Sequence, residues 1–208
     1  MEIAAIHDPK TPGEREIVSQ MHRLRARVFK ERLSWNVRCA KGMEYDKFDA
    51  LSPTYIIALT SQNRVVGCAR LLPATGPTML AAIFPQLLPS GRLDAHARMI
   101  ESSRFCVDTG WQEGRVDGSL HKVTIAMFAG IVEWCLLNGY SEIATATDVR
   151  FERILKRVGW PLRRLGPPTL INETCSVAGI LPADPTSFER LRPQVYCSTF
   201  AVLRSKAA

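Results

Sequence analysis

The sequence predicts an α/β fold in which helices flank a mixed β-sheet. Three observations indicate this fold: two β-branched, apolar runs lie close together in the first half, two amphipathic helices with distinct ends lie in the second half, and strand-like runs accompany both helices. Early hairpins followed by strand–helix–strand units are typical of a mixed sheet covered by helices. With 208 residues and no repeat or Gly/Ser linker, the chain fits one domain over residues 1–208.

In the first half, apolar residues at helical spacing predict a helix over residues 14–29. Residues 35–53 have no sustained period and contain glycine, aspartates and proline, which indicates a long functional loop or lid. The runs 55–60 and 64–72, separated by a short polar turn, predict a hairpin. Residues 79–84 predict a short helix.

In the second half, residues 101–107 predict a strand, and a helix over about residues 120–138 follows, with Gly139 at its end. Residues 141–147 predict another strand, after which Asp148 is expected to cap a second helix. Gly159 is expected to end that helix. Residues 169–178 and 195–203 predict two further strands, and Asp184 and Pro185 predict the start of a short helix between them.

Composition favours a globular enzyme that does not enter membranes. Hydrophobic residues make up 46% of the chain and charged residues 23%, and no apolar run approaches the roughly 20 residues of a membrane span. The start lacks the basic and apolar regions of a signal peptide, so we expect a cytoplasmic protein. Six cysteines are scattered singly, mostly among apolar neighbours, which predicts reduced core thiols and neither a metal site nor disulfides.

The chain carries 27 basic and 20 acidic residues, a net charge of +7 that favours an acidic partner. The excess is concentrated in residues 150–164. A nucleic acid, an anionic membrane or an acidic protein would each fit this segment. A solvated helix face that binds nothing remains an equal alternative.

The most informative pair is Glu101 and Arg104, three residues apart in an otherwise strand-like segment. Ionised pairs rarely enter a core without a task. In a regular strand the two side chains would face opposite sides, so either a bulge brings them together or Arg104 binds other partners. Further polar and aromatic residues complete a candidate active site for a charged substrate: Arg25, Phe29, Trp35, Asp46, Asp49, Arg70 and Phe84.

In this order and at these spacings, those residues resemble the acyl-homoserine-lactone synthases of the LuxI autoinducer type. The strings Met-His-Arg-Leu-Arg-Ala-Arg-Val-Phe, Cys-Ala-Arg-Leu-Leu-Pro and Glu-Ser-Ser-Arg-Phe look like family blocks, and the similarity extends over nearly the whole chain. The resemblance implies a fold like the GCN5-type N-acyltransferases. It also implies transfer of an acyl group from acyl carrier protein to the amine of S-adenosylmethionine. The acylated S-adenosylmethionine then forms a lactone and releases methylthioadenosine, and the lactone is a quorum-sensing signal.

The expected partners are therefore acyl carrier protein and S-adenosylmethionine, with no nucleic acid. No cofactor is expected, because S-adenosylmethionine is a substrate. We expect the first half of the chain, about residues 1–110, to bind S-adenosylmethionine and contain the catalytic residues. The second half, about residues 111–208, is expected to bind the acyl chain and the carrier protein.

An α-ammonium must lose a proton before it attacks a thioester. Glu101 is the candidate base, acting directly or through water, and the alternative is a structural ion pair with Arg104 or Arg70. Asp46 and Asp49 either receive the positive charge of S-adenosylmethionine or pair with arginines to fix the lid. These five residues form the catalytic set.

The substrate-binding set is Arg25, Phe29, Trp35, Phe84, Ser103 and Thr145. Aromatic faces suit a sulfonium or adenine, and core packing is the alternative for the three aromatic residues. Thr145 stands where a threonine accompanies 3-oxo-acyl preference in this family, and Ser103 lies in a block that also contributes there. Thr145 is otherwise an ordinary β-branched strand residue.

The resemblance assigns carrier binding to the basic segment, through Arg150, Arg153, Lys156 and Arg157. Residues 115–120 partly resemble the phosphate loop of GCN5-type acyltransferases, although Leu120 replaces its final small residue. An ordinary turn is at least as good an interpretation. Two rival functions remain, an acetyl-CoA-dependent N-acetyltransferase of a small amine and a non-catalytic nucleic-acid-binding protein, but neither explains the ordered acids and aromatics of residues 25–49.

Overall fold

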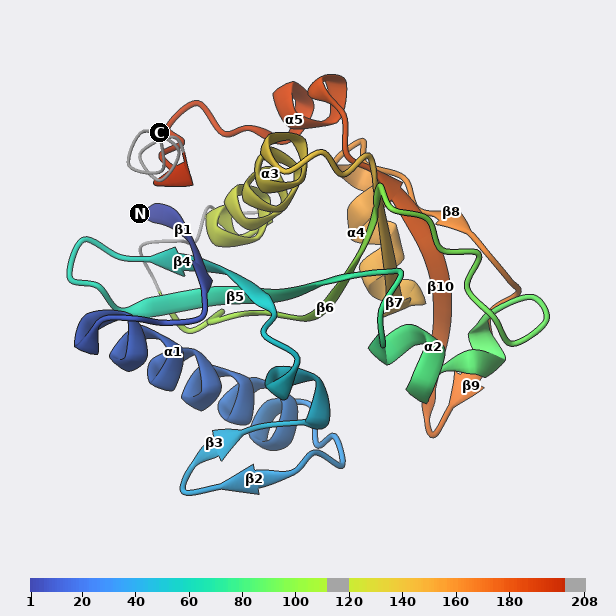
Figure 1. Cartoon of the computed structure of the whole chain (residues 1–208), viewed down its shortest axis with the longest axis horizontal. Coiled ribbons are helices and arrows are strands. Elements are labelled where there is room, and N and C mark those ends of the chain that lie inside the picture. The colour runs from blue at the N-terminus through green and yellow to red at the C-terminus, as the bar shows by residue number, and fades with distance from the viewer. Residues whose placement is uncertain (112–119, 201–208) are drawn as a thin grey trace. The chain divides into compact units, whose positions relative to one another are not determined.

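The computed structural model describes residues 1–111 and 120–200, and the chain divides into two compact units. Figure 1 labels their helices and strands. The first unit comprises Met1–Arg70, Arg104–Ile131 and Arg192–Ala208, and the second Leu71–Ser103 and Val132–Leu191. None of the helices in the described residues is long and apolar enough to cross a membrane.

The first unit contains a sheet with the strand order β1-β4-β5-β6. β1 pairs antiparallel with β4, from Glu2 opposite Leu59 to His7 opposite Thr54. The elements with residues in this unit are β1 (Glu2–His7), α1 (Pro12–Arg25), the π-helix η1 (Ala26–Arg32), β2 (Cys39–Ala40), β3 (Met43–Glu44), the 3₁₀ turn η2 (Lys47–Ala50), β4 (Thr54–Leu59), β5 (Val65–Pro73), β6 (Met99–Val107) and α3 (Lys122–Leu137).

Helix α1 begins at a complete capping box. The Thr11 hydroxyl accepts from the backbone N–H of Glu14, and the Glu14 carboxylate accepts from the backbone N–H of Thr11. Pro12 follows at the first helical position, where no backbone donor is needed. This start sets the register that buries Leu24 and Arg25.

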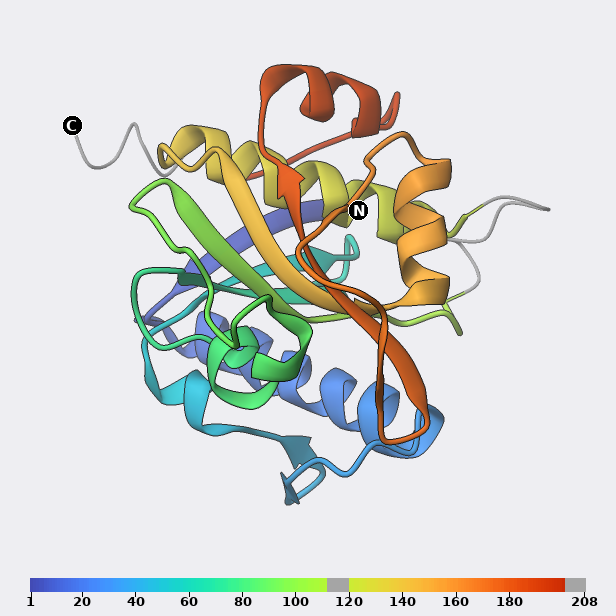
Figure 2. The same cartoon turned by 90° about the vertical axis from the view of Figure 1, so that its right-hand side faces the viewer.

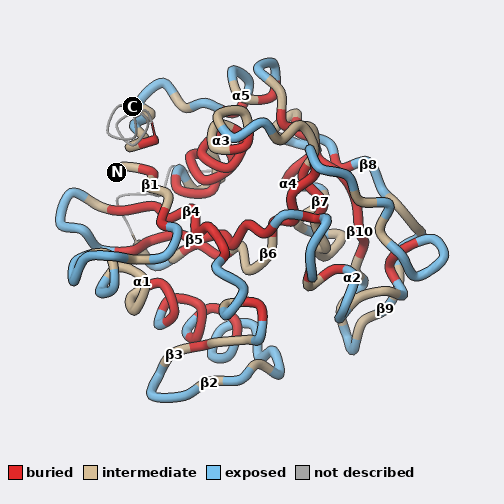
Figure 3. Tube along the Cα trace, in the orientation of Figure 1, coloured by how far each residue is buried: buried red, intermediate tan, exposed pale blue. Residues whose placement is uncertain are grey.

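Two helical layers cover the strands of the first unit. Met21, Leu24 and Phe29 pack in one cluster with Ile57 and Leu59 of β4, and Figure 3 shows these strands as largely buried. On the other face, α3 lies so close that a Cβ added at Gly67 of β5 would meet Val123 at 2.9 Å. The absence of a side chain therefore sets how closely α3 approaches the sheet.

The second unit has the strand order β6-β7-β10-β8, with β9 paired to β10. β6 and β7 are parallel, and β10 is antiparallel to β7, β8 and β9. In Figure 2, β7 and β10 pass between α2 and α4. The elements that complete the unit are α2 (Met79–Ile83), η3 (Pro85–Leu87), β7 (Glu142–Asp148), α4 (Val149–Arg157), β8 (Arg163–Arg164), β9 (Thr169–Ile171), β10 (Thr174–Pro182) and α5 (Pro185–Leu191).

The predicted mixed sheet, the hairpin and the principal helices are confirmed. Gly139 and Gly159 have φ angles of 79° and 76°, as expected of residues that end helices. The Asp148 side chain caps α4 by accepting from the backbone N–H of Phe151 at 2.7 Å. The division of the chain into halves near residue 110 stays a prediction.

Several local predictions are wrong. Residues 35–53 are not one irregular loop, because they contain β2, β3 and η2. The predicted strand 169–178 is two strands joined by a turn. Within the described part of 195–203 there is no strand but a single bridge between Ser198 and Ile3, and Val195 is 91% exposed. β-branched residues form a strand only where a neighbour pairs with them at length.

The cysteine prediction is partly wrong. All six thiols are free, but only Cys68, Cys106 and Cys135 are buried. Cys175 and Cys197 are exposed. Burial raises the pKa of Cys106 and of Cys135, which keeps these thiols protonated and unreactive.

Replacing Gly130 of α3 by alanine should destabilise the protein, although alanine ordinarily favours a helix interior by about 0.5–1 kcal/mol. A Cβ at this position would meet Cγ2 of Ile3 at 2.5 Å, and overpacking of this kind costs about 1–3 kcal/mol. Gly13→Ala in α1 is the control, since the nearest atom to its added Cβ is 4.0 Å away. Thermal melts should show a lower Tm for Gly130→Ala alone, and an increase would contradict the packing described here.

Candidate active site

Six charged side chains of the first unit form a closed ring in which positive and negative groups alternate. Each arginine contacts two carboxylates and each carboxylate contacts two arginines. In ring order the residues are Arg25, Glu44, Arg104, Asp46, Arg70 and Asp49. The three guanidiniums and three carboxylates balance, so the ring adds no net charge to the interior.

Arg25 is fully buried and holds two of the three acids. Its Nε donates to Oε2 of Glu44 at 2.5 Å. Its Nη1 and Nη2 donate to Oδ1 and Oδ2 of Asp49 at 2.7 and 2.9 Å. This bidentate pair matches the planar fork of a guanidinium to a carboxylate, a geometry that lysine cannot reproduce.

The other two arginines close the ring. Nη1 of Arg70 donates to Oδ1 of Asp46 at 2.5 Å and to Oδ1 of Asp49 at 3.0 Å. Nε of Arg104 donates to Oε1 of Glu44 at 3.1 Å. Nη2 of Arg104 lies 2.8 Å from Oδ2 of Asp46, without the alignment of a hydrogen bond.

The backbone near the ring is held by some of the same groups. Asp46 and Asp49 form a reciprocal cap of η2, since Asp46 Oδ1 accepts from the N–H of Phe48 and Asp49 Oδ2 from the N–H of Asp46, both at 2.9 Å. His22 Nδ1 lies 2.8 Å from the carbonyl of Glu44 and must be the donor, because a carbonyl only accepts. Residues 44–49 are therefore fixed through both side chains and backbone.

Electrostatics favour the ionised form of the central pair. Burial opposes the charge of Asp49, but its bonds to Arg25 and the charge of Arg70 hold the pKa of Asp49 well below its usual range. Burial also opposes the charge of Arg25, yet Asp49 and Glu44 raise the pKa of Arg25. Because the folded pKa of Asp49 is lowered, its contribution to stability is present above about pH 4 and is lost as the pH falls toward that folded value.

Neighbouring groups remain neutral beside the ring. Burial and Asp49 raise the pKa of Tyr55, so its hydroxyl donates to Oδ1 of Asp49 at 2.9 Å. Burial and the charge of Arg25 lower the pKa of His22. A neutral imidazole is consistent with its role as a donor to the Glu44 carbonyl.

The sequence leaves two alternatives for Arg104, a bulge that brings it to Glu101 or binding to other partners. The structure shows the second. Arg104 enters the ring through Glu44 and Asp46, and its φ angle of 55° is one that non-glycine residues rarely adopt. Such strain persists where the surroundings fix the residue. Here two carboxylates hold the side chain.

Two aromatic residues extend the ring toward the surface. Phe29 is 1% exposed, and the Arg104 guanidinium lies over its ring at 5.6 Å. The Trp35 ring stacks on that of Phe29, with ring centroids 5.1 Å apart and planes 3° from parallel, and Trp35 is 42% exposed. Phe29 is thus a core residue, whereas Trp35 presents an aromatic surface to solvent.

In the second unit, Glu101 is 1% exposed and its carboxylate meets the start of α2. Oε2 accepts from the backbone N–H of Met79 at 3.0 Å, and Oε1 accepts from that of Leu80 at 2.5 Å. The group is buried, and two backbone donors fix its orientation.

The remaining predicted residues of this unit have ordinary structural roles as well. Phe84 follows the last residue of α2 and packs, partly buried, against a hydrophobic cluster that includes Leu80 and Leu87. The Thr145 hydroxyl donates to the carbonyl of Ser102 at 2.8 Å and so ties β7 to β6. Ser103 is half-buried in β6.

The basic segment lies mostly on α4. The four predicted carrier-binding residues are all exposed: Arg150, Arg153, Lys156 and Arg157. Arg164 is instead bound to Glu152 through two contacts of 2.6 and 2.7 Å. The glycine and arginine of the phosphate-loop candidate, Arg115 and Gly118, lie outside the described residues. In residues 1–111 and 120–200, no group of three or more His, Cys, Asp or Glu side chains is arranged to hold a metal ion.

Sequence reasoning missed Glu44, which bridges two of the three arginines and is fully buried. Charge counting offered a signal. Arg25, Arg70 and Arg104 were recognised, and three buried guanidiniums require three carboxylates, but only two had been assigned from residues 44–49.

Glu44→Gln should lower the free energy of unfolding by about 3 kcal/mol or more, because it leaves Arg25 and Arg104 without a shared counter-charge in the interior. Urea denaturation measures this loss. Glu31→Gln is the matched control, since Glu31 is exposed and should change stability by less than about 0.5 kcal/mol. Equal effects of the two substitutions would show that the ring contributes little.

Comparison with known proteins identifies the family. The family model described as autoinducer synthase matches residues 11–191. A probable acyl-homoserine-lactone synthase of Sinorhizobium fredii is 58% identical over 198 residues, covering 95% of both chains.

Solved structures agree. LasI, an acyl-homoserine-lactone synthase, is 30% identical with a TM-score of 0.78 over 91% of this chain and 93% of its own. TofI, solved with an inhibitor and MTA, is 28% identical with a TM-score of 0.76 over 92% and 96% of the two chains. BjaI, described as a CoA-dependent acyl-homoserine lactone synthase, is 24% identical with a TM-score of 0.82 over 100% and 99%, and indicates the fold.

The expected GCN5-type N-acyltransferase-like fold, a mixed sheet flanked by helices, is confirmed by these neighbours and by the strand order. The match to the family model covers most of the chain, and the S. fredii relative spans nearly all of it. The chain therefore belongs to the autoinducer synthase family and is an acyl-homoserine-lactone synthase.

Proposed function

We propose that this synthase acylates the amine of S-adenosylmethionine with an acyl thioester. The amine attacks the thioester carbonyl, the thiol leaves with a proton, and the S-adenosylmethionine carboxylate then displaces methylthioadenosine to close the lactone. The observation that carries the proposal is the continuous arrangement of the ring, Phe29 and exposed Trp35 in the first unit. Carboxylates beside an aromatic face suit a ligand with ammonium and sulfonium charges. TofI, the 28% identical neighbour, was solved with MTA, which is consistent with this substrate.

The two aspartates have different roles in this proposal. Asp49 bonds to two arginines, to Tyr55 and to the backbone, and only 8% of its side chain is exposed. The side chain of Asp46 is 17% exposed, and its Oδ2, although itself buried 2.8 Å from Nη2 of Arg104, has no aligned hydrogen-bond donor. We assign the substrate ammonium to Asp46 and the support of residues 44–49 to Asp49.

Glu101 has the properties required to receive a proton from the α-ammonium through water. Its carboxylate is buried, and the backbone N–H groups of Met79 and Leu80 fix its orientation. Both carboxylate oxygens already accept from backbone N–H groups, so a relay through an oriented water fits better than direct abstraction.

The acyl donor is proposed to be acyl carrier protein, docked on the exposed basic face of α4. Carrier proteins are acidic, and complementary charge speeds encounter. Arg153 lies three positions from Arg150, three from Lys156 and four from Arg157, so these side chains can face one partner together. The CoA dependence described for BjaI makes acyl-CoA the alternative donor.

Mass spectrometry of an extract from cells expressing the chain should detect acyl-homoserine lactones, and Glu101→Gln should reduce them by about 100-fold or more, as for loss of a general base. The substituted amide also places an NH₂ group against a backbone N–H of α2. Circular dichroism must therefore confirm that the variant is folded. Wild-type lactone yield from the folded variant would remove Glu101 from the mechanism.

Thr145→Val should shift selectivity toward unsubstituted acyl donors. To recognise a 3-oxo group, the Thr145 hydroxyl must give up its hydrogen bond to the Ser102 carbonyl. This exchange limits the preference for 3-oxo over unsubstituted donors to about 1 kcal/mol, or about fivefold in kcat/KM. The measurement is the ratio of kcat/KM for 3-oxo and unsubstituted donors of one chain length. An unchanged ratio would mean that Thr145 is only a link between β7 and β6.

Reversing the charges of Arg153, Lys156 and Arg157 to glutamate should raise KM for the acyl carrier protein and reduce its salt dependence. KM for S-adenosylmethionine should stay the same. Steady-state kinetics over a salt series provides both values, with Arg38→Glu in the first unit as a charge control. An unchanged carrier KM would identify the α4 face as solvated surface.

A further inference from the structure

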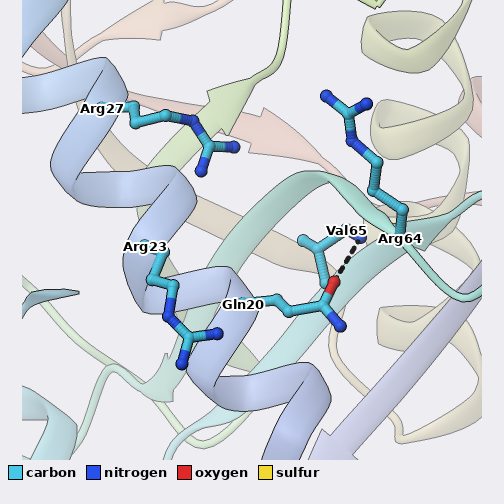
Figure 4. A pocket seen from close by; sticks show the side chains of 5 residues that line it. All are labelled: Gln20, Arg23, Arg27, Arg64 and Val65. Carbon is cyan, nitrogen blue, oxygen red and sulfur yellow. Dashed lines mark hydrogen bonds between the residues drawn. The ribbon is translucent and has the colours of Figure 1, made fainter. Parts of the chain in front are cut away.

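A pocket of about 200 Å³ opens on the first unit, between α1 and the start of β5. Figure 4 shows the five side chains that line it: Gln20, Arg23, Arg27, Arg64 and Val65. Three of the five are arginines, and none belongs to the charged ring. The proposed synthase reaction assigns no role to this pocket.

Helix α1 and the π-helix η1 that continues it present arginines on two different faces. Arg25 is buried in the ring, whereas the side chains of Arg23 and Arg27 are 47% and 49% exposed. Arg23 and Arg27 are four residues apart, so their guanidiniums repel by a few tenths of a kcal/mol. Arg64, 56% exposed, adds a third positive charge from the residue just before β5. Helix stability alone does not favour such a cluster.

One carboxylate already lies between two of these guanidiniums. Oδ2 of Asp108 is 2.8 Å from Nη2 of Arg64 and 3.9 Å from Nη2 of Arg27. Both arginines are therefore directed at one oxygen, and the contact to Arg27 is loose. Arg23 has one exposed partner, Glu16 at 3.2 Å. Each guanidinium has five N–H donors, so these contacts leave donors available.

The pocket also contains an oriented amide. Oε1 of Gln20 accepts from the backbone N–H of Val65 at 3.2 Å, as Figure 4 shows. This bond fixes the Gln20 amide and leaves its NH₂ group as a further donor. Four of the five lining side chains therefore carry hydrogen-bond donors, and three of these carry a positive charge.

We propose that this pocket binds an oligophosphate group, either free pyrophosphate or the diphosphate of a nucleotide. Guanidinium groups match phosphate oxygens bidentately, and a diphosphate offers enough acceptors for three arginines and one amide. Arg27 and Arg23 contribute the donors that Asp108 does not occupy. Asp108 competes with the ligand for Arg64.

Isothermal titration calorimetry of the full chain with pyrophosphate at low ionic strength tests the site. Arg27→Gln and Arg64→Gln should each weaken binding about tenfold, the loss of one charge-assisted contact. Asp108→Asn should tighten binding, because it removes the competing carboxylate. Its amide oxygen can still accept from the Gly110 N–H, a bond of 3.1 Å in this structure.

Two controls remove the same charge elsewhere: Arg38→Gln in the first unit and Arg92→Gln in the second, both at exposed positions. Both should change the affinity by less than about twofold. ADP as a second ligand separates the two sources of the diphosphate, since tighter binding of ADP indicates a nucleotide and equal affinity indicates free pyrophosphate. No binding, equal weakening by a control substitution, or weaker binding by Asp108→Asn would overturn the proposal.

Discussion

The first unit depends on a constraint of charge. Three guanidiniums and three carboxylates are buried together, and each is acceptable there only because two opposite charges touch it. The ring joins α1, β3, the η2 turn with its cap, β5 and β6. Segments 60 residues apart in the chain are thereby fixed to one another, as by the contact between Glu44 and Arg104 at 3.1 Å. Residues 44–49 are ordered for this reason, although their sequence has no strand or helix period.

This dependence explains which features were predictable from sequence. Local signals placed the hairpin, the capped helix after Asp148 and the glycines that end helices, because each of these follows from neighbouring residues. The ring was visible only as an ordered set of charges. Its pairing, the bridging role of Glu44 and the positive φ of Arg104 follow from contacts between distant segments, and no periodic pattern encodes them. The missing strand near residue 195 has the same origin, since pairing with β1 is confined to one bridge.

The site combines rigid and accessible parts. Asp49 and Arg25 are saturated with partners, which leaves them no capacity to bind a substrate without breaking the ring. Asp46 and Trp35 are the members that solvent reaches. In the second unit Glu101 is oriented by backbone N–H groups in the same manner, with few degrees of freedom. Preorganised charge of this kind is the largest contribution that a protein usually makes to such a reaction.

The central claim is that the ring supports the site through Asp49 and meets the substrate through Asp46. The most direct test is calorimetric binding of S-adenosylmethionine to Asp46→Asn and Asp49→Asn, with the Tm of each variant measured in parallel. The account predicts that Asp46→Asn weakens binding about tenfold, and that Asp49→Asn lowers Tm by several degrees and by more than Asp46→Asn, since Asp49 is the more deeply buried of the two. Unchanged affinity in folded Asp46→Asn, together with full stability of Asp49→Asn, would contradict it.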